Sequence, residues 1–110
     1  MGGALQNPGQ LTHRLELQEN VSTADGLGGD EVNWTTLTHL WARVVPVRQS
    51  SAQSADHLQG VVSHEVHIRY RDDVRDGMRF LRQGRILRIL SCLDMDEMRR
   101  YLTCLCEEEK

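Results

Sequence analysis

The sequence predicts an all-β protein: a small antiparallel β-barrel or sandwich of about six strands with two long loops. Several short stretches alternate apolar and polar residues with a period of two, the pattern of strands that bury one face. Segments rich in glycine, aspartate and serine separate these stretches. No long segment has a convincing helical pattern. A closed barrel is favoured because closure leaves no sheet edge exposed.

The chain has 110 residues, a length that predicts a single domain with one core. We expect residues 1–11 to form a flexible arm, residues 12–107 the barrel and residues 108–110 an acidic tail. No apolar run is long enough to cross a membrane. The N-terminus lacks the features of a secretory signal, so cytoplasmic synthesis is expected. The three cysteines, an odd number without a C-x-x-C pair, are expected to be buried or half-buried strand residues.

The N-terminal half predicts two strands. Residues 14–18 alternate and form the first expected strand, with Leu15 and Leu17 facing inward. Residues 22–33, with three glycines and three acids, are expected to be a mobile loop. Residues 34–47 are rich in Thr, Val and Trp and predict a long second strand. Its apolar side changes over along its length, which predicts a twist or a bulge. Pro46 cannot donate to a ladder and is therefore placed at the strand end or a sheet edge.

The C-terminal half predicts an antiparallel meander followed by a last strand. The expected strands cover residues 62–70, 78–81, 86–93 and 99–106, with polar turns between the first three. In the last strand, one face is expected to carry Leu102, Cys104 and Cys106. The large aromatic side chains are expected to lie in the core rather than to form a ligand platform. They are Trp34, Trp41, Tyr70 and Phe80.

Charge is unevenly distributed along the chain. The net charge of -3 does not provide the strong positive field of a dedicated nucleic-acid binder. Seven of the twelve arginines lie between Arg69 and Arg88, whereas the C-terminus is acidic, which suits a subunit that meets its neighbours through opposite charges. The expected subunit interface comprises Arg69, Arg71, Asp73, Arg75 and Arg79. The alternative interpretation is a set of solvated strand faces.

No pattern predicts a reaction centre. His64 and His67 are three residues apart, so they point to opposite faces of a strand and do not reproduce the H-E-x-x-H zinc motif. His67 is expected to form a solvated pair with Glu65. No acid, base and nucleophile converge, so we expect no catalytic, cofactor-binding or metal-binding residue, no cofactor and no enzyme activity.

Three motifs resemble one known family. They are Trp34…Trp41-Ala42-x-Val44-x-Pro46, Val66-x-Ile68-Arg69-Tyr70-Arg71-x-Asp73-Val74-x-x-Gly77-Met78-Arg79-Phe80, and Gly84-Arg85-x-Leu87-x-Ile89. Together they resemble the head-tail joining or adaptor (head completion, stopper) proteins of tailed bacteriophages and their homologues in gene transfer agents. The resemblance spans roughly residues 11 to 106.

The resemblance implies a β-barrel subunit of the virion or particle neck, which forms a homo-oligomeric ring joining the portal and head to the tail. Such a ring extends or closes the DNA channel, enclosing double-stranded DNA without specific binding and without a membrane. The implied partners are a portal-side adaptor and tail-side terminator or tail proteins, in a bacterial host. The implied channel loop comprises Gln49, Ser50, Ser51, Gln53, Ser54, Asp56, His57 and Gln59. The rival interpretation is a small β-barrel nucleic-acid-binding module.

Overall fold

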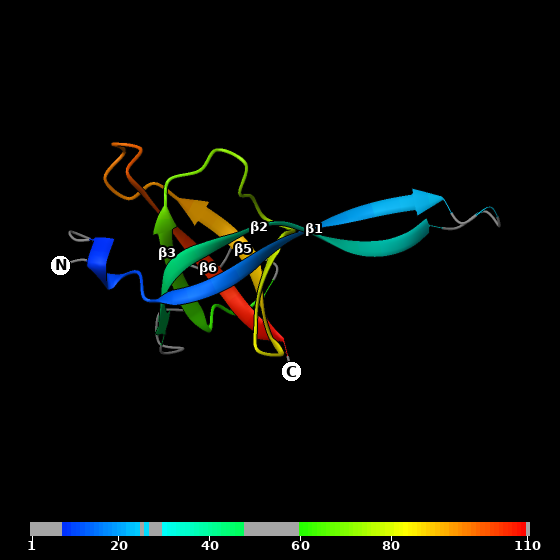
Figure 1. Ribbon diagram of the computed structural model, residues 1–110, viewed down its shortest axis with the longest axis horizontal. Helices are drawn as coiled ribbons and strands as arrows, with labels where there is room; N and C mark the ends of the chain where they lie inside the picture. Colours follow the sequence, from blue (N-terminus) through cyan, green and yellow to red (C-terminus); the bar gives the residue numbers. More distant parts are fainter. Residues whose placement is uncertain (1–7, 25, 27–29, 48–59, 110) are drawn as a thin grey trace.

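The computed structural model describes residues 8–24, 26, 30–47 and 60–109 (Figure 1). A short 3-10 helix, η1 (Pro8–Gln10), precedes six strands. The strands are β1 (His13–Ala24), β2 (Asp30–Pro46), β3 (His64–Arg69), β4 (Arg79–Arg82), β5 (Arg85–Leu93) and β6 (Tyr101–Glu109). The predicted all-β barrel is therefore confirmed. No helix within these described ranges is long and apolar enough to span a membrane.

The strands close into an antiparallel barrel in the order β1-β2-β3-β6-β5-β4. The predicted meander is wrong in its first half, because β3 pairs with β2 and β6 and not with β4. Its second half is confirmed, since β4 and β5 form an antiparallel hairpin. Residues 70–78 are too long for a tight hairpin and arch from the end of β3 to the start of β4 (Figure 1). Val74 and Met78 of this arch are buried, so it caps the core instead of turning the chain directly back.

The barrel core is built from the apolar residues that alternate along each strand. Phe80, Leu15 and Leu17 are fully buried, and the predicted shared face of Leu102, Cys104 and Cys106 in β6 is the buried one. The core cluster comprises Leu15, Leu17, Ala42, Val66, Ile68, Val74, Met78, Phe80, Leu87, Ile89, Leu102, Cys104 and Cys106. β6 continues through Glu109, so Glu108 and Glu109 belong to a paired strand.

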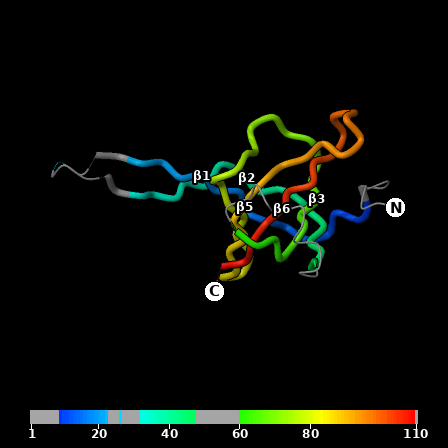
Figure 2. Tube along the Cα trace, turned by 180° about the vertical axis from the view of Figure 1, so that it is seen from behind, coloured from blue at the N-terminus to red at the C-terminus, as the bar shows by residue number. Residues whose placement is uncertain are grey.

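The first two strands extend well beyond the barrel. β1 pairs with β4 only over Glu16–Gln18, and past this point β1 pairs with β2 alone as far as Ala24 opposite Asp30. The result is a two-stranded projection, seen on the right of Figure 1 and on the left in Figure 2. The extents of 52 × 29 × 27 Å reflect this shape. We call this projection, residues 19–24 with 30–35, the arm; from here on the name refers to these residues and not to residues 1–11.

The arm corrects the prediction of a mobile loop over residues 22–33, because both ends of that segment are paired strand. The polar, glycine-rich composition gave no sign of the pairing between β1 and β2, because a two-stranded ribbon with both faces in solvent needs no apolar alternation. The predicted irregularity in the second strand is confirmed. The register shifts between Leu17 and Gln18, which leaves Leu37 as the extra residue of a bulge. This bulge lies where the barrel becomes the arm.

Candidate assembly surfaces

The base of the arm is fixed by contacts with β4. The Arg79 guanidinium lies 4.1 Å from the centroid of the Trp34 ring, and its Nε donates to Gln18 Oε1 at 2.7 Å. Gln18, which is buried, donates from Nε2 to Glu16 Oε2 at 2.8 Å. The Arg75 guanidinium also lies 3.9 Å from the carboxylate of Glu19, the first residue of the arm. These contacts set the direction in which the arm leaves the barrel.

Glu16 also belongs to the base of the arm, which we call the shoulder and which comprises Glu16, Gln18, Trp34 and Arg79. The Thr36 hydroxyl of β2 donates to the Glu16 carboxylate, and together with the Gln18 amide it lowers the pKa of Glu16 below its ordinary value. The carboxylate stays ionised at neutral pH and accepts hydrogen bonds from both sides of the hairpin. The Glu16 carboxylate, the Gln18 amide and the Thr36 hydroxyl therefore join β1 to β2 at the point where the pairing of β1 with β4 ends.

A shallow groove lies on the barrel near η1, with a volume of ≈ 360 Å³. Its residues come from the segment before β1, from β2 and from the end of β3. They are Leu11, Leu40, Trp41, Ile68, Arg69, Tyr70 and Arg71. Trp41 is 52% exposed, and Trp34 lies at the base of the arm outside the core cluster, so the prediction that all four large aromatics belong to the core is wrong for these two rings. We call this surface the Trp41 groove.

The rim of the Trp41 groove is basic. The Arg14 guanidinium carbon lies 5.7 Å from the Trp41 ring centroid, and Arg69 is exposed. Arg71 is held by Asp73 through two hydrogen bonds of 2.9 and 2.8 Å, which lower the pKa of Asp73. Arg71 is thus charge-compensated within the subunit, and the remaining rim charge comes from Arg14 and Arg69.

The residues predicted to form a subunit interface fall into two groups. Arg69, Arg71 and Asp73 lie at or beside the Trp41 groove, whereas Arg75 and Arg79 hold the base of the arm. Their contact with another subunit stays a prediction. Sequence reasoning missed the arm itself and the exposure of Trp41. The available signal was the alternation of Val32 and Trp34 with polar residues, which the glycine- and acid-rich composition just before it made hard to read.

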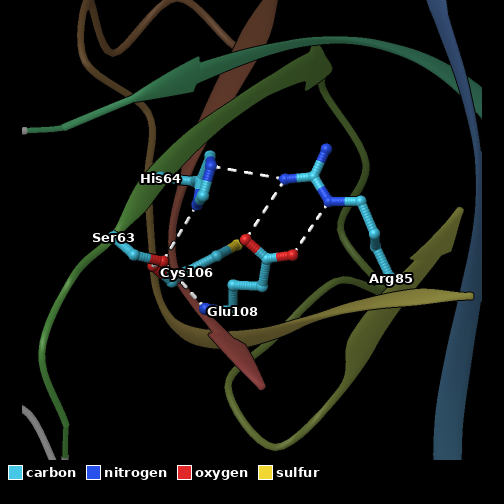
Figure 3. Close-up of polar contacts among 5 residues, drawn as sticks. All are labelled: Ser63, His64, Arg85, Cys106 and Glu108. Carbon is cyan, nitrogen blue, oxygen red and sulfur yellow. Dashed lines mark hydrogen bonds and ion pairs between the residues drawn. The ribbon is translucent and has the colours of Figure 1, made fainter. Parts of the chain in front are cut away.

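A polar network joins the start of β3 to the end of β6, at the end of these strands away from the Trp41 groove (Figure 3). The Ser63 hydroxyl oxygen accepts from the Glu108 backbone N–H at 2.8 Å and lies 2.9 Å from His64 Nδ1. Arg85 donates to the Glu108 carboxylate at 2.8 and 3.2 Å and lies 3.4 Å from His64 Nε2. The backbone N–H of Ser63 donates to the Cys106 carbonyl at 2.8 Å. Side chains from three strands and the segment before β3 are thereby joined.

This network contains Ser, His and Glu but is not arranged as a nucleophilic triad. A guanidinium has only donors, so the His64 Nε2 that faces Arg85 accepts, and Nδ1 carries the hydrogen. His64 therefore donates to Ser63 and cannot take its proton. The carboxylate of Glu108 is bound by Arg85 and does not orient the imidazole. The arrangement stabilises the barrel end and activates no nucleophile.

His67 is buried, with 2% exposure, although it was expected to form a solvated pair. The pairing with Glu65 is present at 3.3 Å, but the other ring nitrogen lies 3.0 Å from the Thr103 hydroxyl of β6. Burial lowers the pKa of His67, and the Glu65 carboxylate only partly opposes this effect. The error arose because the outward face of β3 is buried at His67, although Arg69 on the same face is exposed.

The three cysteines are free and lie in β5 and β6, as the sequence predicted. Cys92 is half-buried and pairs directly across the strands with buried Cys104, the two sulfurs being 3.9 Å apart. This contact lowers the pKa of Cys92, whereas burial raises the pKa of Cys106. Among the described residues, no three His, Cys, Asp or Glu side chains are placed to hold a metal ion. The predicted channel-loop residues 49–59 lie outside the described part.

The fold and these surfaces define a small β-barrel protein with three accessible features. They are the arm, held at its base by Arg79, the Trp41 groove with its basic residues, and the barrel end joined by the Ser63, Arg85 and Glu108 network. Residues 6–109 match the family of phage head completion proteins, and the chain belongs to this family of structural virion proteins. The recognition made from the sequence motifs is thereby confirmed.

Two solved structures are similar to the chain over almost its whole length. One is a chain of the virion of a native gene transfer agent particle, with 28% identity, a TM-score of 0.68, and coverage of 90% of this chain and 96% of that one. The other is the solution structure of protein SF1141 from Shigella flexneri 2a, with 30% identity, a TM-score of 0.73, and coverage of 94% and 96%. A search of curated proteins gave no match.

Proposed function

We propose that this protein forms a ring in the particle neck, between the portal-side adaptor and the tail-side proteins, and closes the DNA channel as a stopper. The observation that carries the proposal is the family match over residues 6–109, together with the similarity to a chain of a gene transfer agent virion. The ring encloses double-stranded DNA and does not bind it specifically. The net charge of -3 supports this, because each neutralised phosphate adds salt-dependent affinity that hinders passage of DNA.

The barrel offers a firm support for a channel element between residues 47 and 60. The Val47 N–H donates to the Ser63 carbonyl at 2.9 Å, which ties the end of β2 to the segment before β3. A Cβ on Gly60 would lie 2.4 Å from Glu107 Oε1, so the Gly60 backbone lies close against the Glu107 side chain of β6. Both described ends are therefore fixed to the barrel end shown in Figure 3. We assign residues 49–59 to the channel on this basis and on the family resemblance.

The test replaces residues 49–59 by a Gly-Ser segment of equal length in the particle that carries this protein. A stopper segment predicts filled heads that lose DNA before tails attach, because the replaced side chains no longer block the channel. Loop closure itself costs little difference in stability at constant length. A replacement of Asp94–Arg99, the exposed turn between β5 and β6, by Gly-Ser is the matched control. Normal DNA retention with normal tail attachment in the loop variant would refute the stopper role.

The rival function, binding of single-stranded nucleic acid, has one observation in its favour: Trp41 is exposed beside Arg14. Single-strand binders stack successive bases on several aromatic rings. Among the described aromatic residues, Phe80 is buried, Tyr70 packs against the core and Trp34 is covered by Arg79. Only Trp41 and the half-buried Tyr101 are left as accessible rings in the described part of the chain. The neck function accounts for more of the structure.

A further inference from the structure

We propose that neighbouring subunits are joined by the arm of one copy seated in the Trp41 groove of the next, with Val32 as the apolar anchor. This inference rests on the proposed ring and names the two surfaces that make it. The occupant of the groove is a second copy of this chain. The contact is directional, since it uses different surfaces on the two subunits.

The arm is incomplete as an isolated structure. Two-stranded hairpins are marginal in water, and this one has both sheet edges open beyond Gln18 and Thr36. Val21 and Val32 are exposed, Val32 to 58%. The register places Ser22 opposite Val32 and Asn33 opposite Val21, so each face of the ribbon carries one exposed valine. The shoulder nevertheless holds the arm in a defined direction, which a surface used for docking requires.

The Trp41 groove complements the arm in polarity and charge. Residues 19–35 contain four acidic residues and no basic residue, and two of these acids, Asp30 and Glu31, immediately precede Val32 in the sequence. The groove combines the apolar Leu11, Leu40 and Trp41 surface with Arg14 and Arg69 on its rim. Seating Val32 on this surface places an acidic strand beside a basic rim. Opposite charges of this kind fix register and suppress the wrong pairing.

The positions of the two surfaces suit a ring. The arm projects from one end of the long axis, whereas η1 and the first residues of β1, next to the groove, lie at the other end (Figure 1). A contact between different surfaces propagates head to tail and closes into a ring when the rotation between copies allows it. The paired part of the arm is about 20 Å long from the strand rise, enough to reach across a neighbouring barrel face. Arm-to-arm pairing would instead form a closed dimer.

The test places a photoreactive benzoylphenylalanine at Val32 and, as a matched control, at Val61, which is exposed outside both surfaces. Irradiation is carried out on joined particles and on the purified protein at high concentration, and the products are mapped by mass spectrometry. We expect the Val32 probe to label a second copy at residues 11–14, 40–43 or 68–71. The Val61 probe is expected to label other sites.

Charge reversal provides the second measurement. Arg69→Glu should reduce the yield of joined particles about tenfold or more, the effect of losing a principal interface side chain. The control, Arg99→Glu in the exposed turn between β5 and β6, should leave the yield unchanged.

Three results would overturn the proposal: Val32 products on another surface of a second copy, Val32 products with DNA, or no arm-to-groove product in either sample. These results would refute the contact between subunits but not the proposed neck function, as long as the protein is found in particles whose heads are joined to tails. Absence of the wild-type protein from purified particles would refute the proposed function itself, while the solution experiment still tests the contact.

Discussion

Removing the arm should leave the barrel folded. The perturbation replaces residues 21–33 by Asn-Gly, a two-residue turn suited to a hairpin, so that Asn20 and Trp34 remain paired. In the strand ladder, the described residues among those removed pair with each other, and the exposed Val21 and Val32 are not part of the core cluster. Losing a marginal hairpin while shortening the connection changes the free energy of unfolding by no more than about 1 kcal/mol. The corresponding shift in melting temperature is about 4 °C.

The assay is urea unfolding followed by circular dichroism, with Arg79→Ala as a comparison. That substitution removes the stack on Trp34 and the bond to buried Gln18, and should cost about 1–3 kcal/mol. The shoulder should thus matter more to stability than the whole arm. A loss above about 3 kcal/mol, or non-cooperative unfolding, on arm removal would refute the reasoning, because such a result would make the arm part of the barrel's folding unit.

Three further predictions concern the barrel. Phe80→Ala, which truncates a fully buried ring, should lower the free energy of unfolding by about 3–5 kcal/mol; a loss below about 1 kcal/mol in denaturant titration would contradict the packing. Because the folded pKa of His67 lies below its ordinary value of 6.5, stability is fully present above that pH and is lost as the pH falls through it. His67→Gln should flatten this dependence in pH-resolved melting curves, and an unchanged slope would count against it. Cys92 should react with a maleimide in the native state well before Cys106, and equal rates in a mass-resolved time course would show that the strand opens.

The sequence alone determined the elements and much of the core. Alternation with a period of two located six strands and placed Leu102, Cys104 and Cys106 on one face of β6, because burial on one side of a pleated strand requires that spacing. The same spacing placed Leu15 and Leu17 inside. The motif from Val66 to Phe80 identified the family, which the match over residues 6–109 confirmed.

Tertiary structure alone decided which strands are neighbours and which faces are covered. Alternation does not identify a strand's partners, so the arch over residues 70–78 and the pairing of β3 with β6 could not be read from it. His67 is buried on the nominally outer face, and Trp41 is exposed on a strand face that it shares with His39 and Arg43. The arm was hidden for the same reason: a ribbon solvated on both faces has no apolar period, and its strands are defined only by pairing with each other.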